Sequence, residues 1–280
     1  MMKKLFALLL AAMMVLSLAA CGAKEEPAPQ EEQPAETPAE TPAAESDVAY
    51  VQDKGTLVVG MTDFAPMDYK LEGSDEWVGF DADMARAFGA HLGVDVEFVE
   101  INWDNKAMEL ETKAIDAVWN GMTLTEETKS LMDCSDPYCM NAQVVVVAAD
   151  KADQYQTVES LSGLNFAVEN GSAGAEQLDI LNIPYTAMDT QAKALMEVAA
   201  GASDACVIDL LMAGAMIGEG TSYPDLTYTV QLNSEEYGVG FRKGSDLVAS
   251  FNEFWKGAYD AGTVDDIATT YGVDEAIVKK

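Results

Sequence analysis

Five short, predominantly apolar runs are spaced along the chain. They cover residues 56–61, 117–119, 144–148, 164–168 and 205–208. Runs of this length that lack a regular alternation of apolar and polar positions are typical of strands covered on both faces, as in a parallel sheet. Four of the runs are followed directly by a polar residue, namely Thr62, Asn120, Glu169 and Asp209. All five runs are predicted as strands.

Segments with helical spacing separate these strands. Residues 81–92 and 191–200 carry apolar side chains at helical intervals, and Asp81 is predicted to be the N-cap of the first helix. Alternating strands and helices predict a sheet with parallel strands and right-handed crossovers. Because the same order of elements starts again at Gln143, the sequence predicts two α/β units.

Polar, small and aromatic residues gather where the predicted strands end. They are Asp63, Phe64, Trp103, Asn120, Gly121, Glu169 and Asp209. Open α/β sheets bind ligands at the carboxyl ends of their strands. We therefore expect these residues to surround a ligand site.

The first residues of the chain have the pattern of an export signal. Lys3 and Lys4 precede an apolar stretch over residues 5–18, which is shorter than the roughly 20 residues of a membrane-spanning helix. Small residues then lead to Cys21, as in a bacterial lipobox. We predict that residues 1–20 are a signal peptide and that Cys21 carries acyl chains that anchor the protein to the membrane. An ordinary signal peptide followed by a chance cysteine is the alternative.

Residues 21–47 are predicted to be the lipidated cysteine and a disordered tether. Residues 24–47 contain five of the nine prolines and seven glutamates, and they include the near-repeat P-A-E-T-P-A-E-T-P-A-A-E. Such a composition offers little apolar surface to bury and repels itself. We expect the tether to hold a folded body, beginning near Val48, away from the membrane.

The charge of the chain restricts its partners. The formal net charge is −32 and the pI is about 4.1, which argues against a nucleic-acid partner because such binding relies on basic surface. Solubility is the simplest explanation of the acidity, and attraction of cationic ligands is the second. The odd number of cysteines that follow Cys21 cannot pair completely within the chain, and neither their spacing nor the single histidine, His91, matches a metal site. We predict no metal, no cofactor and no histidine-based nucleophile.

Residues 117–147 carry the most specific pattern. They contain G-M-T-L-T-E-E-T and D-C-S-D-P-Y, and they are preceded by G-F-D-A-D and W-D and followed by E-E-Y-G-V-G-F-R-K-G. This order resembles that of the amino-acid-type extracellular solute-binding proteins of bacterial ABC importers, over about residues 51–271. One departure stands out: the family pattern G-[MIF]-[ST]-[IL]-T-x-x-R ends in arginine, whereas this chain has Thr128.

The resemblance implies a type II periplasmic-binding-protein fold, in which two α/β domains with parallel sheets are joined by two hinge strands. Residues 48–140 and 237–280 would form lobe 1, and residues 141–236 would form lobe 2. The ligand would lie between the lobes and be delivered to a membrane permease. We expect a monomer.

The resemblance also assigns the ligand contacts. Phe64 and Trp103 would be aromatic walls, Asp209 would bind the ligand's ammonium group, and the remaining contacts would come from Asp63, Asn120, Gly121, Thr123, Thr128, Glu169, Ser172 and Ala173. Structural roles compete with these assignments: core residues for the two aromatic side chains, a turn for Gly121 and Thr123, and an N-cap for Asp209.

The ligand class depends on charge. A threonine cannot replace the two-pronged grip of arginine on a carboxylate, and Lys129 would reach the site only if its loop were rearranged. Glu169 and Asp209 place two potential anions beside aromatic rings, which attract cations. We therefore predict a basic amino acid or a related amine, with a neutral polar amino acid as the alternative. A dehydratase of the same fold, with Glu169 as a general acid, is the competing function, and a sensory domain is disfavoured.

Overall fold

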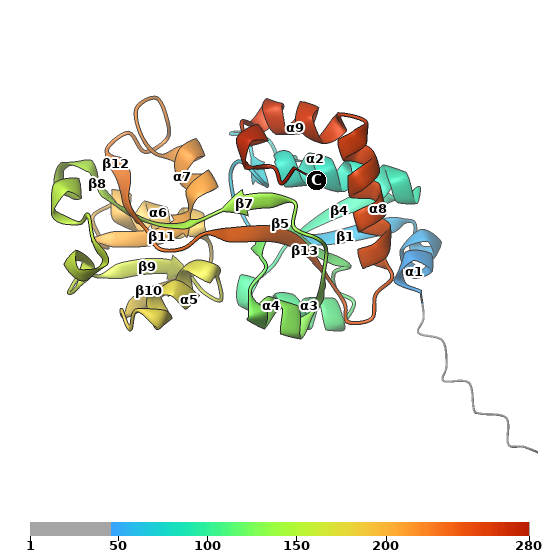
Figure 1. Cartoon of the computed structure of the whole chain (residues 1–280), viewed down its shortest axis with the longest axis horizontal. Helices are drawn as coiled ribbons and strands as arrows, with labels where there is room; N and C mark the ends of the chain where they lie inside the picture. Colours follow the sequence, from blue (N-terminus) through green and yellow to red (C-terminus); the bar gives the residue numbers. More distant parts are fainter. Residues whose placement is uncertain (1–45, 280) are drawn as a thin grey trace, which may run out of the picture. The chain divides into compact units, whose positions relative to one another are not determined.

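Two mixed β-sheets organise residues 46–279, the part of the chain that the computed structural model describes (Figure 1). The first sheet has the strand order β4-β1-β5-β13-β6, and β7 pairs with β13. Its strands are β1 (Thr56–Met61), β4 (Asp95–Glu100), β5 (Ala117–Thr123), β6 (Asp133–Cys134), β7 (Cys139–Asn141) and β13 (Glu235–Phe241). β1 is parallel to β4 and β5, whereas β13 is antiparallel to its three neighbours.

The second sheet has the order β10-β9-β11-β8-β12. Its strands are β8 (Gln143–Ala148), β9 (Phe166–Glu169), β10 (Tyr185–Met188), β11 (Ala205–Asp209) and β12 (Leu226–Gln231). β9, β10 and β11 are parallel, and β8 is antiparallel to β11 and β12. We call each sheet with the elements packed on it lobe 1 and lobe 2.

Both sheets are mixed because two strands cross between them. β7 belongs to the first sheet and β8 to the second, and only Ala142 separates them. The return crossing runs from β12 to β13, beside the first crossing, and the backbone amide of Leu232 donates to the carbonyl of Gln143 at 2.8 Å (Figure 1). β8 and β13, the strands that follow the two crossings, run antiparallel to their neighbours in the sheets that they join. The predicted architecture of two α/β sheets is therefore confirmed, and each sheet also contains antiparallel strands.

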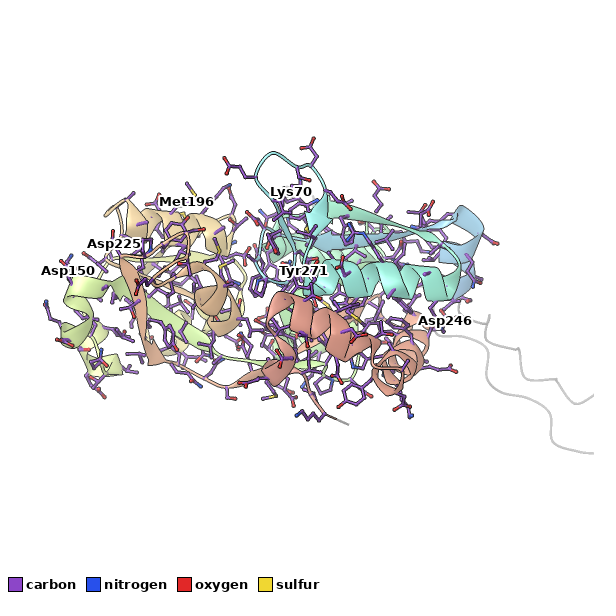
Figure 2. The ribbon with its side chains drawn as sticks, turned by 90° about the horizontal axis from the view of Figure 1, so that it is seen from above. Lys70, Asp150, Met196, Asp225, Asp246 and Tyr271 are labelled. Atoms are coloured by element: carbon purple, nitrogen blue, oxygen red, sulfur yellow. The ribbon has the colours of Figure 1, made fainter. Side chains whose placement is uncertain are left out.

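Helices cover the first sheet. They are α1 (Asp47–Lys54), α2 (Phe80–Leu92), α3 (Lys106–Glu111), α4 (Glu126–Leu131), α8 (Leu247–Asp260) and α9 (Thr263–Tyr271), with the short 3-10 turns η1 (Trp103–Asn105) and η4 (Asp274–Ala276) and the hairpin β2 (Tyr69–Lys70) and β3 (Trp77–Val78). Phe88 of α2 packs at 5.5 Å, ring centre to ring centre, on Phe251 of α8. The hydroxyl of Tyr271 in α9 donates to Asp83 of α2 at 2.7 Å, and Tyr271 is labelled in Figure 2. The C-terminal helices α8 and α9 thus pack on the first sheet beside α2.

Strand β8 shows why the apolar runs are continuous. Val144 and Val146 pack in one hydrophobic cluster, whereas Val145 and Val147 pack in another. Successive side chains of a strand point to opposite faces, so both faces of the second sheet are buried. The covering elements are α5 (Ala173–Ile180), α6 (Gln191–Ala199), α7 (Leu210–Met216), η2 (Ala149–Gln154) and η3 (Val158–Leu161).

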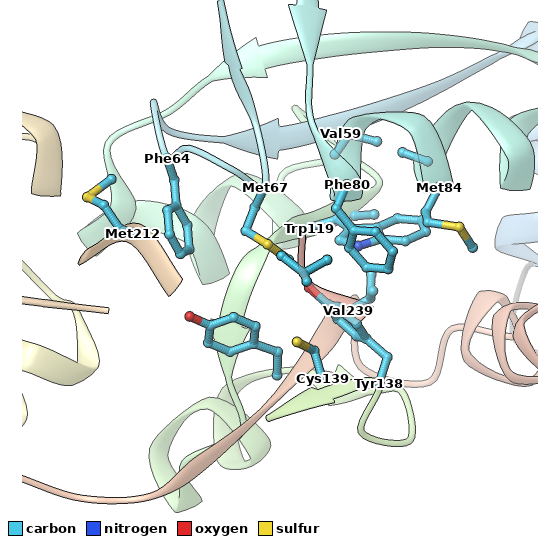
Figure 3. Packing of buried hydrophobic residues seen from close by; sticks show 14 of the residues in the cluster. Val59, Phe64, Met67, Phe80, Met84, Trp119, Tyr138, Cys139, Met212 and Val239 are labelled. Carbon is cyan, nitrogen blue, oxygen red and sulfur yellow. The ribbon is translucent and has the colours of Figure 1, made fainter. Parts of the chain in front are cut away.

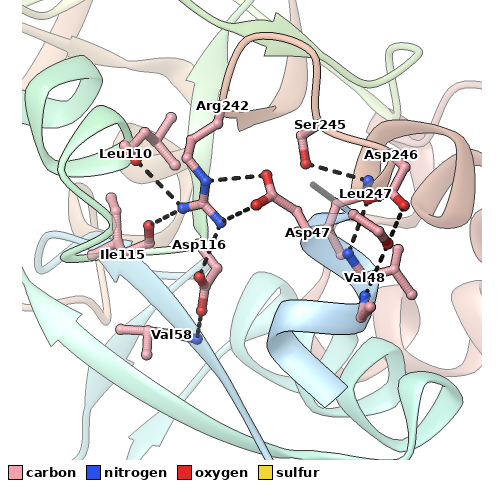
Figure 4. Close-up of polar contacts among 12 residues, drawn as sticks. Asp47, Val48, Val58, Leu110, Ile115, Asp116, Arg242, Ser245, Asp246 and Leu247 are labelled. Carbon is pink, nitrogen blue, oxygen red and sulfur yellow. Dashed lines mark hydrogen bonds and ion pairs between the residues drawn. The ribbon is translucent and has the colours of Figure 1, made fainter. Parts of the chain in front are cut away.

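A buried ion cluster fixes the start of the folded body (Figure 4). The guanidinium of Arg242 lies 3.0 Å from each of the two carboxylate oxygens of Asp47 and 3.3 Å from Asp116. Ser46 is the N-cap of α1, and its hydroxyl donates to Asp246 at 2.5 Å. The predicted end of the tether at Asp47 is therefore wrong, because Arg242 binds this residue into lobe 1. The predicted signal peptide, Cys21 and the rest of the tether lie outside the described residues.

Asp81 is not the N-cap of α2. The cap position is Gly79, which makes no side-chain cap bond. The fully buried Asp81 instead accepts hydrogen bonds from the amide of Gly121 at 2.7 Å and the hydroxyl of Tyr138 at 2.8 Å. Burial raises the pKa of Asp81 to about 7. Its carboxyl group thus fixes the backbone of β5 at Gly121. This role arises only because α2 packs on the first sheet.

Candidate functional site

A cavity of about 310 Å³ is lined by residues of both lobes. This volume is in the range of small-molecule sites. Lobe 1 contributes η1, the first turn of α3, the end of β5 and the start of α4, and lobe 2 contributes the ends of β9 and β11 and the start of α5. The parallel strands of each sheet thus present their carboxyl ends to the cavity, as predicted from the run pattern.

Most of the predicted contact residues line this cavity. They are Trp103, Asn120, Gly121, Thr123, Thr128, Glu169, Ser172, Ala173 and Asp209. These residues come from five separate segments of the sequence, and the two sheets bring them together.

Asp63 and Phe64 do not line it. Phe64 is 1% exposed, and its ring packs edge-on against Tyr237 at 6.4 Å. The ring also fills the space above Gly121, where an added Cβ would come within 2.5 Å of it. Phe64 shares a hydrophobic cluster with Met212 of α7, which lies near it in Figure 3. The expected aromatic wall at Phe64 is therefore part of the core, while Asp63 is exposed to solvent.

Asn120 and Gly121 contribute to the cavity chiefly through their backbone. The side-chain oxygen of Asn120 accepts hydrogen bonds from the amide and hydroxyl of Thr62, and its nitrogen donates to the Thr62 carbonyl and to Asp68. This amide therefore has no donor left over for a ligand. Gly121 has a φ of +57°, which favours glycine.

The threonines before α4 form a local network. Thr125 is the N-cap and accepts from the amide of Thr128 at 3.1 Å. The hydroxyl of Thr128 lies 3.0 Å from the carbonyl oxygens of both Thr123 and Thr125, to which it donates. Thr128 therefore uses its only hydroxyl proton within the loop, and it supplies no cation where the family pattern has arginine.

Two buried carboxyl groups lie at the ends of neighbouring parallel strands. Glu169 ends β9 and Asp209 ends β11, and they are 2% and 3% exposed. One oxygen of Glu169, Oε1, has no hydrogen-bond partner among the described residues. Burial raises the pKa of Glu169 to about 8, and repulsion from Asp209 adds to the shift. Such an unpaired buried oxygen is suited to a ligand that donates hydrogen bonds.

Asp209 is held by amide side chains. It accepts hydrogen bonds from Gln191, Asn141 and Gln143. Asn141 and Gln143 lie at the first crossing and also donate to Glu235 at the second, at 2.6 and 2.8 Å. Asp209 occupies the N-cap position of α7 but makes no side-chain cap bond there, so its carboxyl group is bound by these amide side chains instead. Burial, followed by repulsion from Glu235, raises the pKa of Asp209 to about 8.

The start of α5 meets lobe 1 closely. Gly171 has a φ of +68°, and a Cβ added there would come within 2.8 Å of the backbone of Asp104. Ser172 is the N-cap of α5 and accepts from the amide of Ala175 at 3.2 Å. The glycine therefore permits the loop after β9 to approach η1 across the cavity.

Sequence reasoning missed Lys106. This lysine begins α3, is 8% exposed and lines the cavity. Its ammonium nitrogen lies 3.1 Å from the carbonyl oxygen of Trp103 and 3.0 Å from that of Gly171. Desolvation lowers its pKa, while the charge of Glu169 acts in the opposite direction. The available signal was its spacing: Lys106 follows the predicted wall residue Trp103 by three positions, which places both on one side of a helical turn.

The site has no metal-binding arrangement within the described part of the chain, where no group of three or more His, Cys, Asp or Glu side chains is placed to hold a metal ion. The cysteines 134, 139 and 206 are all unpaired. Over residues 46–279, every helix is too short or too polar to cross a bilayer.

Comparison with known proteins finds a protein family whose model matches most of this chain. The model of the bacterial extracellular solute-binding proteins, family 3, matches residues 57–274. The chain is 29% identical over 275 residues to the arginine-binding extracellular protein ArtP of Bacillus subtilis (strain 168), covering 95% of this chain and 96% of that protein. It is 27% identical over 207 residues to the L-cystine-binding protein TcyJ of Escherichia coli (strain K12), covering 72% and 77%.

A solved structure extends this similarity to the fold. An ancestral arginine-binding protein bound to arginine superposes with a TM-score of 0.70 at 31% identity, covering 78% of this chain and 98% of that one. The two-sheet architecture with paired crossing strands is thus the type II periplasmic-binding-protein fold.

Proposed function

This chain belongs to the bacterial extracellular solute-binding proteins of family 3, and on that basis we propose that it captures a basic amino acid in the cavity between its lobes for import by an ABC transporter. The observation that carries this ligand class is the pair of buried carboxyl groups, Glu169 and Asp209, in one cavity. An ammonium or guanidinium group supplies several donors to such a pair.

The charge of the whole lining supports a cationic ligand. The carboxyl side chains that line the cavity are those of Asp104, Glu127, Glu169, Glu176, Asp179 and Asp209, against the single ammonium of Lys106. A lining with six acidic side chains and one basic side chain attracts cations and repels anions. The ring of Trp103 already has the ammonium nitrogen of Lys106 over it, 5.0 Å from the ring centre, so the attraction for a cationic ligand rests on the carboxyl groups.

The relatives point in the same direction. ArtP is named for arginine, and the ancestral structure holds arginine. TcyJ is named for cystine, so the family alone does not select a basic ligand. The preference for a basic amino acid therefore rests on the carboxyl groups of this cavity.

Titration calorimetry with L-arginine, L-lysine, L-histidine, L-glutamine and L-glutamate tests the ligand class. We expect the basic amino acids to bind most tightly and glutamate most weakly. A preliminary thermal-shift screen over all amino acids and common polyamines identifies any binder, because a ligand specific to the native state raises the melting temperature. Tightest binding by glutamate would overturn the charge reasoning.

We also propose that the body acts as a monomer attached to the membrane through acyl chains on Cys21. The lipobox and the proline- and glutamate-rich segment that follows support this attachment. The partners in this proposal are the small-molecule ligand, the membrane and the permease, and the strong net negative charge argues against nucleic acid.

Enzymatic turnover is the competing function. The family and the curated relatives named above are binding proteins, and we propose that this chain is not an enzyme. A dehydratase on the same fold would need cations for the two carboxylates of a prephenate-like acid, and this cavity supplies one, Lys106. Incubation with prephenate and analysis of the products distinguishes the two functions, because product formation would require a catalytic role for Glu169.

A further inference from the structure

The cavity contains one buried cation that the resemblance does not assign. Of the lining residues in the described chain, Lys106 is the only lysine or arginine. It comes from α3, whereas the family's arginine position is Thr128 in α4. Thr128 offers no charge and uses its hydroxyl proton on its own loop. A carboxylate bound in this cavity therefore has Lys106 as its only available side-chain cation.

The ammonium group of Lys106 has spare bonding capacity. An ammonium carries three donors, and the two acceptors of Lys106 are the neutral carbonyl oxygens of Trp103 and Gly171. Within residues 46–279 no carboxylate lies within ion-pair distance of its nitrogen. Burial disfavours the charged form of Lys106, and the carboxylates that favour it, those of Glu169, Asp104 and Glu127, lie beyond ion-pair distance. An anion of the ligand within bonding distance would therefore stabilise the ammonium group further.

We propose that Lys106 binds the carboxylate of the ligand and thereby selects amino acids over amines that lack a carboxylate. This inference rests on the proposed function, since it assigns a second subsite to the same cavity. Glu169 and Asp209 would hold the cationic part of the ligand, and Lys106 would hold its anionic part. Together they require a ligand with both charges, which excludes polyamines as preferred ligands.

Lys129 is the nearest alternative cation in the sequence. Its side chain is 49% exposed, it lies 3.7 Å from Glu126 one turn earlier, and it does not line the cavity. It therefore serves as a matched control, because replacing it removes the same charge from the same lobe.

A second alternative is that Lys106 only holds the lobes together. Its bond to Gly171 joins α3 of lobe 1 to the loop after β9 of lobe 2. Loss of such a bridge would alter the affinity for every ligand by the same factor. A role in binding the carboxylate would alter the affinity only for ligands that carry one, so paired ligands separate the two roles.

The experiment measures the dissociation constants of L-arginine and agmatine, which differ by the α-carboxylate, and of L-histidine and histamine as a second pair. The proteins are the unaltered chain, Lys106→Met, Lys106→Gln, Lys106→Arg and Lys129→Met. Glutamine keeps hydrogen-bond donors for the two carbonyls without the charge, and it provides a folded comparison if Lys106→Met fails to fold. Circular dichroism and thermal unfolding verify that each variant is folded.

We expect the unaltered protein to prefer the amino acid of each pair. Lys106→Met and Lys106→Gln should reduce this preference by about 10- to 100-fold, the range for a hydrogen bond to a charged group. Lys106→Arg should restore most of it, and Lys129→Met should leave it unchanged. Equal weakening of both members of each pair would show that Lys106 is only a bridge, and an unchanged preference would overturn the proposal. If the unaltered protein binds no amino acid at all, the proposed function itself fails.

Discussion

Replacing Glu169 by glutamine tests the buried charge of the cavity directly. Glu169 is 2% exposed, and its Oε1 has no partner among the described residues. Burial raises its pKa from 4.5 to about 8. Between pH 4.5 and pH 8, Glu169 therefore keeps its proton in the folded protein, whereas in the unfolded chain it has released it. Stability is therefore lost as the pH rises through this window, and the loss is absent below pH 4.5.

The magnitude follows from the linkage of protonation and folding. A tenfold difference in proton affinity corresponds to about 1.4 kcal/mol, so this shift destabilises the native state by on the order of 4 kcal/mol at and above pH 8. From pH 5.5 to pH 8 the change is roughly 3 kcal/mol. Glutamine has nearly the same shape and no titrating proton, so the variant Glu169→Gln loses this dependence. The stability of Glu169→Gln relative to the unaltered protein should therefore rise by roughly 3 kcal/mol from pH 5.5 to pH 8.

Urea unfolding of the ligand-free protein at pH 5.5 and pH 8, followed by tryptophan fluorescence, measures this gain. Glu253→Gln is the control, because Glu253 is an exposed residue of α8 and its replacement removes the same charge from the surface. The reasoning is refuted if the stability difference between Glu169→Gln and the unaltered protein is the same at both pH values. A parallel titration should show weaker binding of L-arginine by Glu169→Gln at pH 8, because the variant lacks the carboxyl group that loses its proton at about this pH.

Three other predictions concern the rest of the molecule. Arg242→Met leaves Asp47 and Asp116 without their buried partner and should lower the free energy of unfolding by about 3–5 kcal/mol in urea, whereas Lys256→Met, which breaks an exposed pair with Asp260, should cost about 0–1 kcal/mol; equal effects would contradict the structural role of the cluster. Cys21→Ala should move the protein from the membrane fraction to the soluble fraction of fractionated cells, and unchanged membrane association would remove the lipid anchor from the proposal. Small-angle scattering should show a smaller radius of gyration with saturating L-arginine, since a ligand that contacts both lobes favours a closed state; identical profiles would count against hinge closure.

Local physics made much of the fold predictable. The valines of β8 occupy both faces of a buried sheet, and such a strand must be apolar at every position. The same runs located the ends of β9 and β11, so Glu169 and Asp209 could be assigned to one edge of a sheet before their neighbours were known. The spacing of polar residues after strands thus carried most of the candidate site.

Long-range packing decided the rest. Phe64 follows β1 as a wall residue should, yet its ring is buried because Gly121, Tyr237 and Met212 leave a space that it fills. Asp81 has the sequence context of an N-cap, but Gly121 and Tyr138 draw it inward. No local pattern distinguishes these outcomes, because the partners lie between 40 and 57 residues away from Asp81.

The burial of the two cationic side chains was also decided by long-range packing. Lys106 and Arg242 have the sequence contexts of surface residues, and a lysine or arginine is rarely buried without a partner. Arg242 is buried because Asp47 and Asp116 meet it from distant parts of the chain. Lys106 is buried because Gly171 of the opposite lobe offers a carbonyl oxygen 3.0 Å away. The sequence by itself determined the strands, the helices and the edge of each sheet where a ligand can bind. Only the tertiary structure decided which charges face that ligand, because this depends on how the two sheets approach one another.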